Sequence, residues 1–572
     1  METVSSYALR AAPTASTEAT PVVDVYRILV NNGATYNNNA NLSVQDAHAP
    51  SATSAGAITV DGGSFNNSGS LIVGNGQGTI TVQNGSSFAQ AANGSLTTTI
   101  DAAGNSTKFI VKDTSETTLN GTMNIVPTKD FYGSSQTIDL LDASSTGDFT
   151  LDNSLSINVF TTEGITAAAN VDENGNINIT RQRHFDTLVQ DDGQKQLGKI
   201  LSDNVDYLGA LLHTGQEWRK LYAELEALDG AGKASALKQI SPSIMGSSAQ
   251  AILSTHSMLN SMNMLGSFSN NIPETATGGG RGPQASIKPQ YNSWRNIIMP
   301  FSAYTDQHNG ASGYTNHNNG VMGAMERTFE NGLTQGYHIA INHQSTSSAS
   351  QRIKGEGFYV GTQAKYSPAD WNGWQLFGGA RLGLENMRSH RSLILAGGSM
   401  GTADADWNGF SGSFTLGTTL EKEHGSMRSG PFAALDYSFA HRPSVTESGA
   451  AYKAHLDSST YDSLRTQLGY RLSSKPKALD SYDSTQWQAH ASVAWNHELL
   501  SDNGKTSYQL ADLPGQTISD TVENYGRDSM SIAAGITFKT PQRLDVGLTL
   551  GSDIYRHGGS SIFSKVNLEW KF

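Results

Sequence analysis

Hydrophobic and polar residues alternate along the last eleven residues of the chain, Ile562–Phe572. One parity carries Ile562, Val566, Leu568, Trp570 and Phe572, and the other carries Lys565, Asn567, Glu569 and Lys571. A period of two is that of a β-strand with one apolar and one polar face. Such a strand needs a partner at its edge, because unpaired backbone groups would otherwise pair with other chains. We expect it to close a β-barrel.

The same alternation recurs through the C-terminal half. It predicts twelve strands, at approximately 292–306, 319–330, 334–345, 355–366, 373–387, 407–421, 430–440, 461–472, 486–498, 529–539, 543–554 and 562–572. Each reaches the roughly 9–11 residues with which a tilted strand crosses the hydrocarbon core of a bilayer. The fold class that follows is all-β, with a 12-stranded antiparallel transmembrane barrel over residues 291–572. A soluble β-sandwich is the alternative.

Two features favour the barrel over the sandwich. Aromatic residues lie at the strand ends, as in the girdles of membrane barrels: Trp294, Tyr304, Tyr366, Trp374, Trp487, Trp495 and Trp570. The connections are also unequal. We expect Met387–Trp407, His441–Tyr461 and Leu499–Arg527 to be extracellular loops, and Glu330–Thr334 and Lys539–Leu544 to be periplasmic turns. The polar parity would then line the lumen with Lys365, Arg381, Glu385, Arg465, Arg471, Gln375 and His490.

The N-terminal part has a different texture. From Asn31 to about Thr180, short apolar pairs are separated by turns rich in Gly, Asn, Asp and Ser; examples are Ile58/Val60, Ile80/Val82, Leu96/Ile100, Phe109/Val111, Met123/Ile125 and Ile138/Leu140. Strands this short cannot bury a core alone, but stacked rungs of a right-handed parallel β-helix can. An ordinary β-sandwich is again the alternative.

Between these parts the period changes to that of a helix. Leucines recur at helical spacing from His184 to Phe268, and the glycine-rich stretch Asp229–Lys233 is expected to separate two helical pieces. Ser241 and Pro242 predict the start of a further helix, since Ser is a good N-cap and Pro suits the first helical position. Residues Ser243–Asn271 contain no Asp, Glu, Lys or Arg.

A helix of small, neutral and flexible side chains suits a tight polar channel. We expect it to occupy the barrel pore through Ser243, Met245, Ala249, Ile252, Met258 and Met262. An ordinary interdomain helix is the alternative. The patterns together divide the chain into a disordered segment (1–30), a β-helix region (31–183), a helical linker with the pore helix (184–271), a flexible linker (272–290) and the barrel (291–572).

Composition narrows the function classes. The chain has 572 residues, a net charge of −13 and no cysteine. The negative net charge and the sparse Lys and Arg argue against a protein that binds nucleic acid or an anionic membrane surface, since both need clustered basic residues. The lack of cysteine fits export through an oxidising compartment. No apolar run reaches the length of about 18 residues that a transmembrane helix needs. The first ten residues lack the features of a signal peptide. If the protein is exported, the chain would be a processed form, a truncated form or one with a misassigned start, and of these we favour truncation.

Three motifs resemble known families. The terminal V-N-L-E-W-K-F resembles the C-terminal signature of bacterial outer-membrane barrels, with Asn567 where Gly is common, and the resemblance implies that Val566, Leu568, Trp570 and Phe572 are read by the barrel assembly machinery. The segments Thr117–Pro127 and Ser135–Thr150 resemble the end of autotransporter passengers. The stretch Leu237–Met245 resembles the segment before autotransporter barrels, with Ser243 where an acidic residue is usual.

The order of solenoid, helix, barrel and terminal Phe resembles a monomeric (type V) autotransporter. The resemblance implies an outer-membrane translocator that displays its own passenger at the cell surface, for adhesion or aggregation. The implied partners are outer-membrane lipid, the barrel assembly machinery, periplasmic chaperones, and a host or neighbouring-cell surface, and the implied oligomeric state is a monomer. A remnant of a larger secreted hydrolase and a porin-like channel are the alternatives.

Motifs for chemistry are scarce. The sequence contains no G-x-S-x-G, H-E-x-x-H or Walker loop, and the solenoid holds one histidine, His48. Asp172–Asn176 lacks the spaced acidic ligands of a calcium loop. We therefore expect no enzyme, no metal and no cofactor. Some autotransporters release their passengers by Asn cyclisation at an Asn-Asn pair, which makes Asn270-Asn271 a possible cleavage site, although Pro273 would disturb the helix there.

Overall fold

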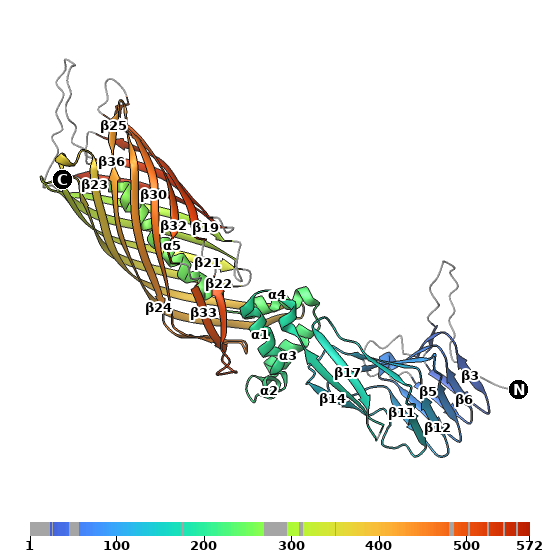
Figure 1. Ribbon diagram of the computed structural model, residues 1–572. Helices are drawn as coiled ribbons and strands as arrows, with labels where there is room; N and C mark the ends of the chain where they lie inside the picture. Colours follow the sequence, from blue (N-terminus) through green and yellow to red (C-terminus); the bar gives the residue numbers. More distant parts are fainter. Residues whose placement is uncertain are drawn as a thin grey trace, which may run out of the picture. The chain divides into compact units, whose positions relative to one another are not determined.

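The computed structural model describes residues 23–25, 27–44, 57–173, 175–267, 294–307, 313–348, 351–479, 485–500, 504–522, 526–540, 544–555 and 559–571. The chain divides into two compact units (Figure 1). The first contains the residues up to Gln190, with Leu197–Ala236 and the short segment Leu395–Met400. The second contains Asp191–Gln196, Leu237–Ile394 and Gly401–Phe572. The predicted combination of solenoid, helices and 12-stranded barrel is confirmed.

The first unit is built on three parallel sheets that form a solenoid of about four turns. One sheet has the order β1 (Val23–Val25), β4 (Asn41–Val44), β7 (Ser70–Val73), β10 (Ser95–Ile100), β13 (Thr122–Pro127) and β16 (Ser156–Val159). The second has the order β11 (Lys108–Val111), β8 (Thr79–Gln83), β5 (Ala57–Asp61) and β2 (Arg27–Asn31). The third has the order β15 (Asp148–Leu151), β12 (Glu116–Leu119), β9 (Ser87–Gln90), β6 (Ser64–Asn67) and β3 (Thr35–Asn38).

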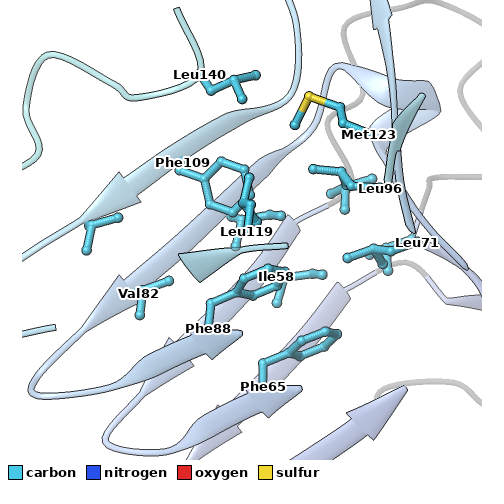
Figure 2. Packing of buried hydrophobic residues seen from close by; sticks show 14 of the residues in the cluster. Ile58, Phe65, Leu71, Val82, Phe88, Leu96, Phe109, Leu119, Met123 and Leu140 are labelled. Atoms are coloured by element: carbon cyan, nitrogen blue, oxygen red, sulfur yellow. The ribbon is translucent and has the colours of Figure 1, made fainter. Parts of the chain in front are cut away.

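The core of the solenoid consists of in-register columns of like residues. Ile58 pairs with Ile28 on one side and Ile80 on the other, so one column is aliphatic. A second column is aromatic: Tyr36, Phe65 and Phe88 are in register on β3, β6 and β9, with ring centroids 5.0 Å apart between Tyr36 and Phe65 and 5.1 Å apart between Phe65 and Phe88. Phe109 of β11, in another of the three sheets, contacts Phe88 edge-on with centroids 5.5 Å apart. Figure 2 shows Ile58, Phe65, Phe88 and Phe109 in one shared interior, and Ile28 and Ile80 belong to the same buried cluster. The apolar pair of one short strand is too small to form a core, and parallel stacking combines many such pairs into one.

Buried amides occupy a corner of the same interior. The Asn38 side chain donates to Asn67 Oδ1 at 2.8 Å, and the Asn67 side chain donates to Gln90 Oε1 at 3.2 Å. All three residues are buried. The ladder satisfies polar groups that would otherwise be costly inside an apolar core.

Two sequence-based boundaries of the solenoid need correction. The segment 1–30 is not wholly disordered, because β1 and the start of β2 lie within it and pair with β4 and β5. The end of the region is not parallel. There β14 (Ser135–Ile138), β18 (Ile177–Arg183) and β17 (Ile165–Val171) form an antiparallel sheet, whose Ile177 and Ile179 join the buried core. Neighbouring strands supply the partners in both places, which local composition does not reveal.

Helices follow this sheet. They are η2 (Phe185–Leu188), α1 (Asp192–Asp203), α2 (Val205–Gly209), α3 (Gly215–Glu226), α4 (Gly230–Ile240) and α5 (Ile244–Ser267); the short helices η1 (Gly74–Gly76) and η3 (Ala369–Trp371) lie elsewhere. The expected break between two helical pieces is present and lies at residues 227–229, between α3 and α4. The glycines themselves belong to the second piece. They form the first turn of α4, because Asp229 Oδ1 accepts a hydrogen bond from the Gly232 amide at 2.7 Å. Within the described chain, no helix is long and apolar enough to cross a membrane.

A buried ion pair connects the antiparallel sheet with the helices of the first unit. Arg183 on β18 lies 2.7 Å from Glu226 at the end of α3. Burial raises the pKa of Glu226, while the Arg183 charge acts in the opposite direction. Arg183 also donates to the Tyr132 carbonyl oxygen at 2.5 Å. Paired and hydrogen-bonded in this way, the two charges are tolerated in a dry environment.

The second unit contains a closed antiparallel barrel of twelve strands. They are β19 (Trp294–Gln307), β20 (Tyr314–Thr328), β21 (Leu333–Ser348), β22 (Gln351–Tyr366), β23 (Trp374–Leu395), β24 (Gly398–Leu420), β26 (Met427–Arg442), β30 (Ser459–Ser474), β32 (Gln486–Glu498), β35 (Asp528–Lys539), β36 (Leu544–Tyr555) and β37 (Gly559–Lys571). Short strands at the two ends are β25 (Lys422–His424), β27 (Val445–Thr446), β28 (Ser448–Gly449), β29 (Ala454–Leu456), β31 (Lys477–Ala478), β33 (Gly504–Leu510) and β34 (Ile518–Val522).

The last strand closes the barrel against the first. β37 pairs antiparallel with β19, with Leu568 opposite Ile298 and Glu569 opposite Ile297. On the lumen side of this seam, Arg295 binds Glu326 of β20 and lies 3.3 Å from Glu569. The terminal strand therefore has the partner that its alternating pattern demands.

The predicted loop Met387–Trp407 is wrong. β23 continues to Leu395 and β24 begins at Gly398, so a tight hairpin replaces most of the loop. The pairing continues because inward side chains remain buried along it, including Met387 and Arg391. Polar outward residues such as Arg388 hid this continuation, since a strand that leaves the lipid no longer needs an apolar outer face.

Replacement of a solenoid core ring tests the stacked columns. Phe88→Ala should lower the stability of the first unit by about 3–5 kcal/mol, because it removes one member of the aromatic column and leaves a cavity. Thr118→Ala, on the outward face of β12, should cost under about 0.5 kcal/mol. Calorimetry of the full chain in detergent measures both, with the barrel transition as internal reference. Equal effects of the two substitutions would contradict the column.

Candidate functional site

The lumen of the barrel is occupied by a helix. Figure 1 shows α5 in green inside the ring of strands. Nearly every side chain from Ser243 to Asn260 is buried, although none of these residues is charged. A neutral helix avoids the desolvation penalty that a charged one would incur in the same space. The interior is therefore the candidate functional site.

Of the residues predicted to occupy the pore, Ser243 immediately precedes α5 and the others lie within it. Those with described side chains are all buried: Ser243, Met245, Ala249, Ile252 and Met258. Met262 lies in the last turns of α5. Asn270, Asn271 and Phe572 fall outside the described residues.

Side chains of the barrel wall bind the middle of α5. His256 Nε2 lies 2.7 Å from Ser411 Oγ on β24. Arg381 on β23 donates to Asn260 Oδ1 at 3.0 Å. Asn318 on β20 donates to Thr255 Oγ1 at 2.7 Å. The helix is thus held by hydrogen bonds to separate strands.

The opposite wall contributes further contacts. The Asn260 side-chain amide donates to Asp436 Oδ1 on β26 at 3.4 Å, and Arg465 on β30 donates to Ser257 Oγ. Beside them lies a polar cavity of about 260 Å³, lined by residues that include Asp436, Arg465 and Glu498. Its size and lining suit several bound water molecules, each of which occupies about 30 Å³. The opposite wall therefore holds the helix through these hydrogen bonds and leaves a polar cavity beside them.

The remaining predicted lumen residues also face inward. Glu385 accepts a hydrogen bond from Ser411. Arg471 lies 2.7 Å from Glu421, and His490 Nε2 lies 3.1 Å from Thr549 Oγ1. Lys365 and Gln375 are buried on the same side of their strands.

The His256, Ser411 and Glu385 trio does not form a nucleophilic relay. In such a relay the histidine stands between the serine and the carboxylate. Here Ser411 stands in the middle and donates its single proton to Glu385. His256 therefore cannot take up that proton, and the trio serves to position the helix. Among the described residues, no group of three or more His, Asp or Glu side chains is arranged to hold a metal ion.

A second set of contacts holds the junction between α4 and α5 at the mouth of the lumen. Arg391 on β23 donates to the Ile240 carbonyl oxygen at 2.5 Å, and Gln351 on β22 donates to the Ser241 carbonyl oxygen at 2.8 Å. Helix C-termini carry carbonyl groups without intrahelical partners and a partial negative charge. Cationic and amide donors from the wall therefore cap α4.

Acidic residues complete this mouth site. Both oxygens of Glu447 bind the Arg391 guanidinium, and the Arg391 Nε to Glu447 Oε1 distance is 2.6 Å. Ser241 donates to Asp520 of β34 and accepts a hydrogen bond from the Ser243 amide at 3.2 Å. α5 begins at Ile244, two residues later than the predicted start at Pro242, so Ser241 is not its N-cap and instead binds the turn that precedes the helix. Ser241 is itself bound by Asp520 of the hairpin formed by β33 and β34.

Sequence reasoning missed the mouth residues Gln351, Arg391, Glu447 and Asp520. The alternation predicts a connection or loop at each of these four positions. No local pattern marks them, because their role depends on where α4 ends in space. One available signal is Arg391, a charged residue on the inward parity of the alternating run that extends β23.

The sequence of the barrel matches a known protein family. Residues 299–551 match the family model described as the autotransporter β-domain. The barrel is an autotransporter β-domain. This fold supports an outer-membrane location for the barrel. No curated protein is significantly similar to the chain in sequence.

Solved structures with a similar fold include three autotransporter domains. The translocator domain of NalP from Neisseria meningitidis is 12% identical, covers 50% of this chain and 90% of its own, and has a TM-score of 0.40. The β-domain of Bordetella BrkA is 14% identical, with coverages of 49% and 100% and a TM-score of 0.35. The transport unit of AIDA-I from Escherichia coli is 15% identical, with coverages of 50% and 92% and a TM-score of 0.33. The assignment of the β-domain rests on the family match and not on these distant structures.

The mouth site predicts an asymmetry between single and double substitutions. Arg391→Met should destabilise the α4–α5 junction by about 3–5 kcal/mol, because Glu447 then lacks its buried partner. Arg391→Met combined with Glu447→Met should cost less than the single change, since no charge remains unpaired. Hydrogen exchange of amides 237–243 in the full chain measures both. A double variant as unstable as the sum of two single variants would contradict the pairing.

The stability of the hairpin of β33 and β34 should depend on pH, because it contains the buried carboxyl of Asp520 outside the membrane-spanning strands. Burial raises the pKa of Asp520 from 3.8 to about 7, although the hydrogen bond from Ser241 lowers it. The folded hairpin thus binds a proton more tightly than the unfolded chain does, so stability should be greatest below pH 4 and fall as pH rises to about 7.

Amide exchange of Ile518–Val522 should therefore be slower at pH 5 than at pH 8, after correction for the intrinsic exchange rate. Asp520→Asn should remove this difference, whereas Asp462→Asn, on an exposed outward position of β30, should leave it intact. A pH dependence that persists in Asp520→Asn would show that another group is responsible.

Proposed function

We propose that the chain inserts its β-domain in the outer membrane and displays its own β-solenoid at the cell surface. The course of α5 carries the proposal. Its N-terminal end is held by Arg391 and Asp520, at the end of the barrel with the long connections. Farther along α5, Asn260 binds Arg381, which lies nearer the start of β23 than Arg391 does, so the helix runs towards the opposite end of the barrel. At that end β19 begins, and Trp294 lies opposite Arg327 beside a short turn.

This direction has a simple consequence for the preceding chain. A segment that passes through the lumen from the short-turn end must leave it at the end with the long connections. The solenoid precedes α5 in sequence, so it belongs to the outer side. The neutral surface of α5 supports passage through a polar lumen, because no charge has to be desolvated on the way.

A surface epitope experiment tests the direction. A peptide tag inserted between Asp172 and Asn176, in the turn from β17 to β18, should be labelled by antibody on intact cells that express the full chain. The matched control carries the tag in the short turn at residues 330–331, and it should be labelled only after the outer membrane is permeabilised. The reverse labelling pattern, or labelling of neither tag in intact cells, would contradict display.

The displayed stem has a role in adhesion or aggregation in this proposal. Its outward positions carry uncharged polar side chains that are paired between rungs. Asn66 donates to Asn37 Oδ1 at 2.9 Å, and Ser87 donates to Ser64 Oγ at 3.0 Å. A regular, weakly charged polar face supports contact with a host or neighbouring-cell surface. The porin alternative requires an open lumen, which α5 occupies here.

Two further parts of the proposal concern the ends of the β-domain. Val566, Leu568 and Trp570 lie on the outward face of β37, accessible to the assembly machinery and to periplasmic chaperones before closure. Release of the passenger by cyclisation at Asn270-Asn271 stays a prediction. Expression of the full chain and blotting of the membrane for a barrel fragment of the size of residues 271–572 tests it, and a single full-length band would exclude cleavage.

A further inference from the structure

The outer face of β22 and β23 changes character abruptly beyond the lipid-facing belt. On β22 the exposed apolar residues are Val360 and Phe358, and on β23 they are Leu382 and Leu384. Farther along the same outward parity, towards the mouth, β22 carries Glu356, Lys354 and Arg352, and β23 carries Asn386, Arg388 and His390. All six of these side chains are exposed. The basic residues thus begin two strand positions beyond the first polar residue that borders the belt.

The strand register places the basic residues opposite one another. Lys354 lies directly opposite Arg388, and Arg352 lies directly opposite His390. Like charges at directly opposed positions of an antiparallel pair destabilise the sheet. This arrangement therefore calls for an anion between the two strands.

The protein supplies that anion on one side only. On β24, Asp406 lies 3.4 Å from Arg388 and Asp404 lies 2.6 Å from the His390 ring. On β22, Arg352 donates to Ser345 Oγ at 3.1 Å, which is a neutral partner. Within the described residues, no carboxylate lies within ion-pair distance of Lys354 or Arg352. Two of the three permanent cations are therefore left without a counterion from the chain.

The three basic residues Arg352, Lys354 and Arg388 also differ from the residues at the same end of the other described barrel strands. At the mouth end of the described barrel strands, outward-facing Lys and Arg occur at Arg352, Lys354 and Arg388, while the other strands present Tyr, Thr, Ser, Asn, Asp or His there. The other outward basic residues of the strands, such as Lys477, lie at the opposite end. At the mouth end of the described barrel strands, outward-facing Lys and Arg are thus confined to β22 and β23.

We propose that Arg352, Lys354 and Arg388 bind the phosphate of a lipid in the outer leaflet, whose acyl chains lie along the apolar belt below. Phosphate oxygens accept several charge-assisted hydrogen bonds, and guanidinium and ammonium groups are the donors that proteins use for them. Basic residues immediately beyond the hydrocarbon boundary attract anionic headgroups. The distance along β22 from Phe358 to Lys354 is four residues, or about 13 Å of strand, which suits a headgroup above the hydrocarbon edge.

The source of the phosphate is a lipid and not a free anion, because the basic residues continue the lipid-facing parity of both strands. A headgroup there is bound by charge while its chains are bound by Val360, Phe358 and Leu384. Free phosphate would gain only the first interaction, in an exposed and screened site. Binding should therefore need both the phosphate and the acyl chains.

The test uses the purified full chain in neutral detergent micelles and two forms of one glycolipid, phosphorylated and dephosphorylated. The dissociation constant of each lipid is measured by titration at low and at high salt. The wild-type chain should bind the phosphorylated form at least tenfold more tightly than the dephosphorylated form, and salt should reduce this preference. Inorganic phosphate at matched concentration should compete at least tenfold more weakly than the phosphorylated lipid.

Three variants locate the site. Arg352→Gln with Lys354→Gln and Arg388→Gln should lose the preference for phosphate. Asp404→Asn with Asp406→Asn should strengthen binding of the phosphorylated lipid about threefold, because the competing carboxylates are gone. Lys477→Gln, a basic residue at the opposite end, should bind as the wild type does. The opposite signs expected of the first two variants keep the test informative if one of them fails to fold.

The outcomes separate clearly. An unchanged preference in the triple variant, or equal binding of the two lipid forms, would overturn the site. Equally strong competition by inorganic phosphate would show a general anion site and overturn the assignment to a lipid. Heat-modifiable mobility on gels shows that each variant retains a folded barrel.

Discussion

Backbone hydrogen bonding in lipid is the constraint on which the second half of this protein depends. No water is available in the hydrocarbon core, so every strand needs two partners and the sheet must close. The seam between β19 and β37 provides this closure, and Arg295 crosses it on the lumen side to reach Glu569. Once the sheet is closed, its two faces meet opposite solvents, which accounts for the alternation of apolar and polar residues along each strand.

The closed lumen then sets the properties of the helix within it. The wall carries Arg381, Glu385 and Asp436, and it binds the neutral helix through hydrogen bonds. A neutral helix occupies this space without the desolvation penalty of a charged one. α5 meets this demand with Ser, Thr, Asn and His side chains. Hydrogen bonds from several strands hold α5, so the helix occupies one position although it carries no charge.

The solenoid solves the same backbone problem in water by stacking. Its strands of three to six residues pair in parallel with the neighbouring rungs, and equivalent positions fall into columns such as Ile28, Ile58 and Ile80. The antiparallel sheet of β14, β18 and β17 ends the column, and the buried Arg183–Glu226 pair connects it to α3. Within the first unit, the apolar core of the solenoid is thus followed along the chain by a buried ion pair between β18 and α3.

The sequence by itself determined the twelve strands, the face that each presents, the buried pairs of the solenoid and the neutral helix, because these depend on periods of two or 3.6 residues within one segment. Only the tertiary structure decided the strand lengths beyond Met387, the antiparallel end of the solenoid and the mouth site of Gln351, Arg391, Glu447 and Asp520. The physical reason is that a local period reports the solvent on each face of a strand. Pairing partners and helix caps depend instead on residues that are distant in sequence, and a strand that has left the membrane no longer shows the period.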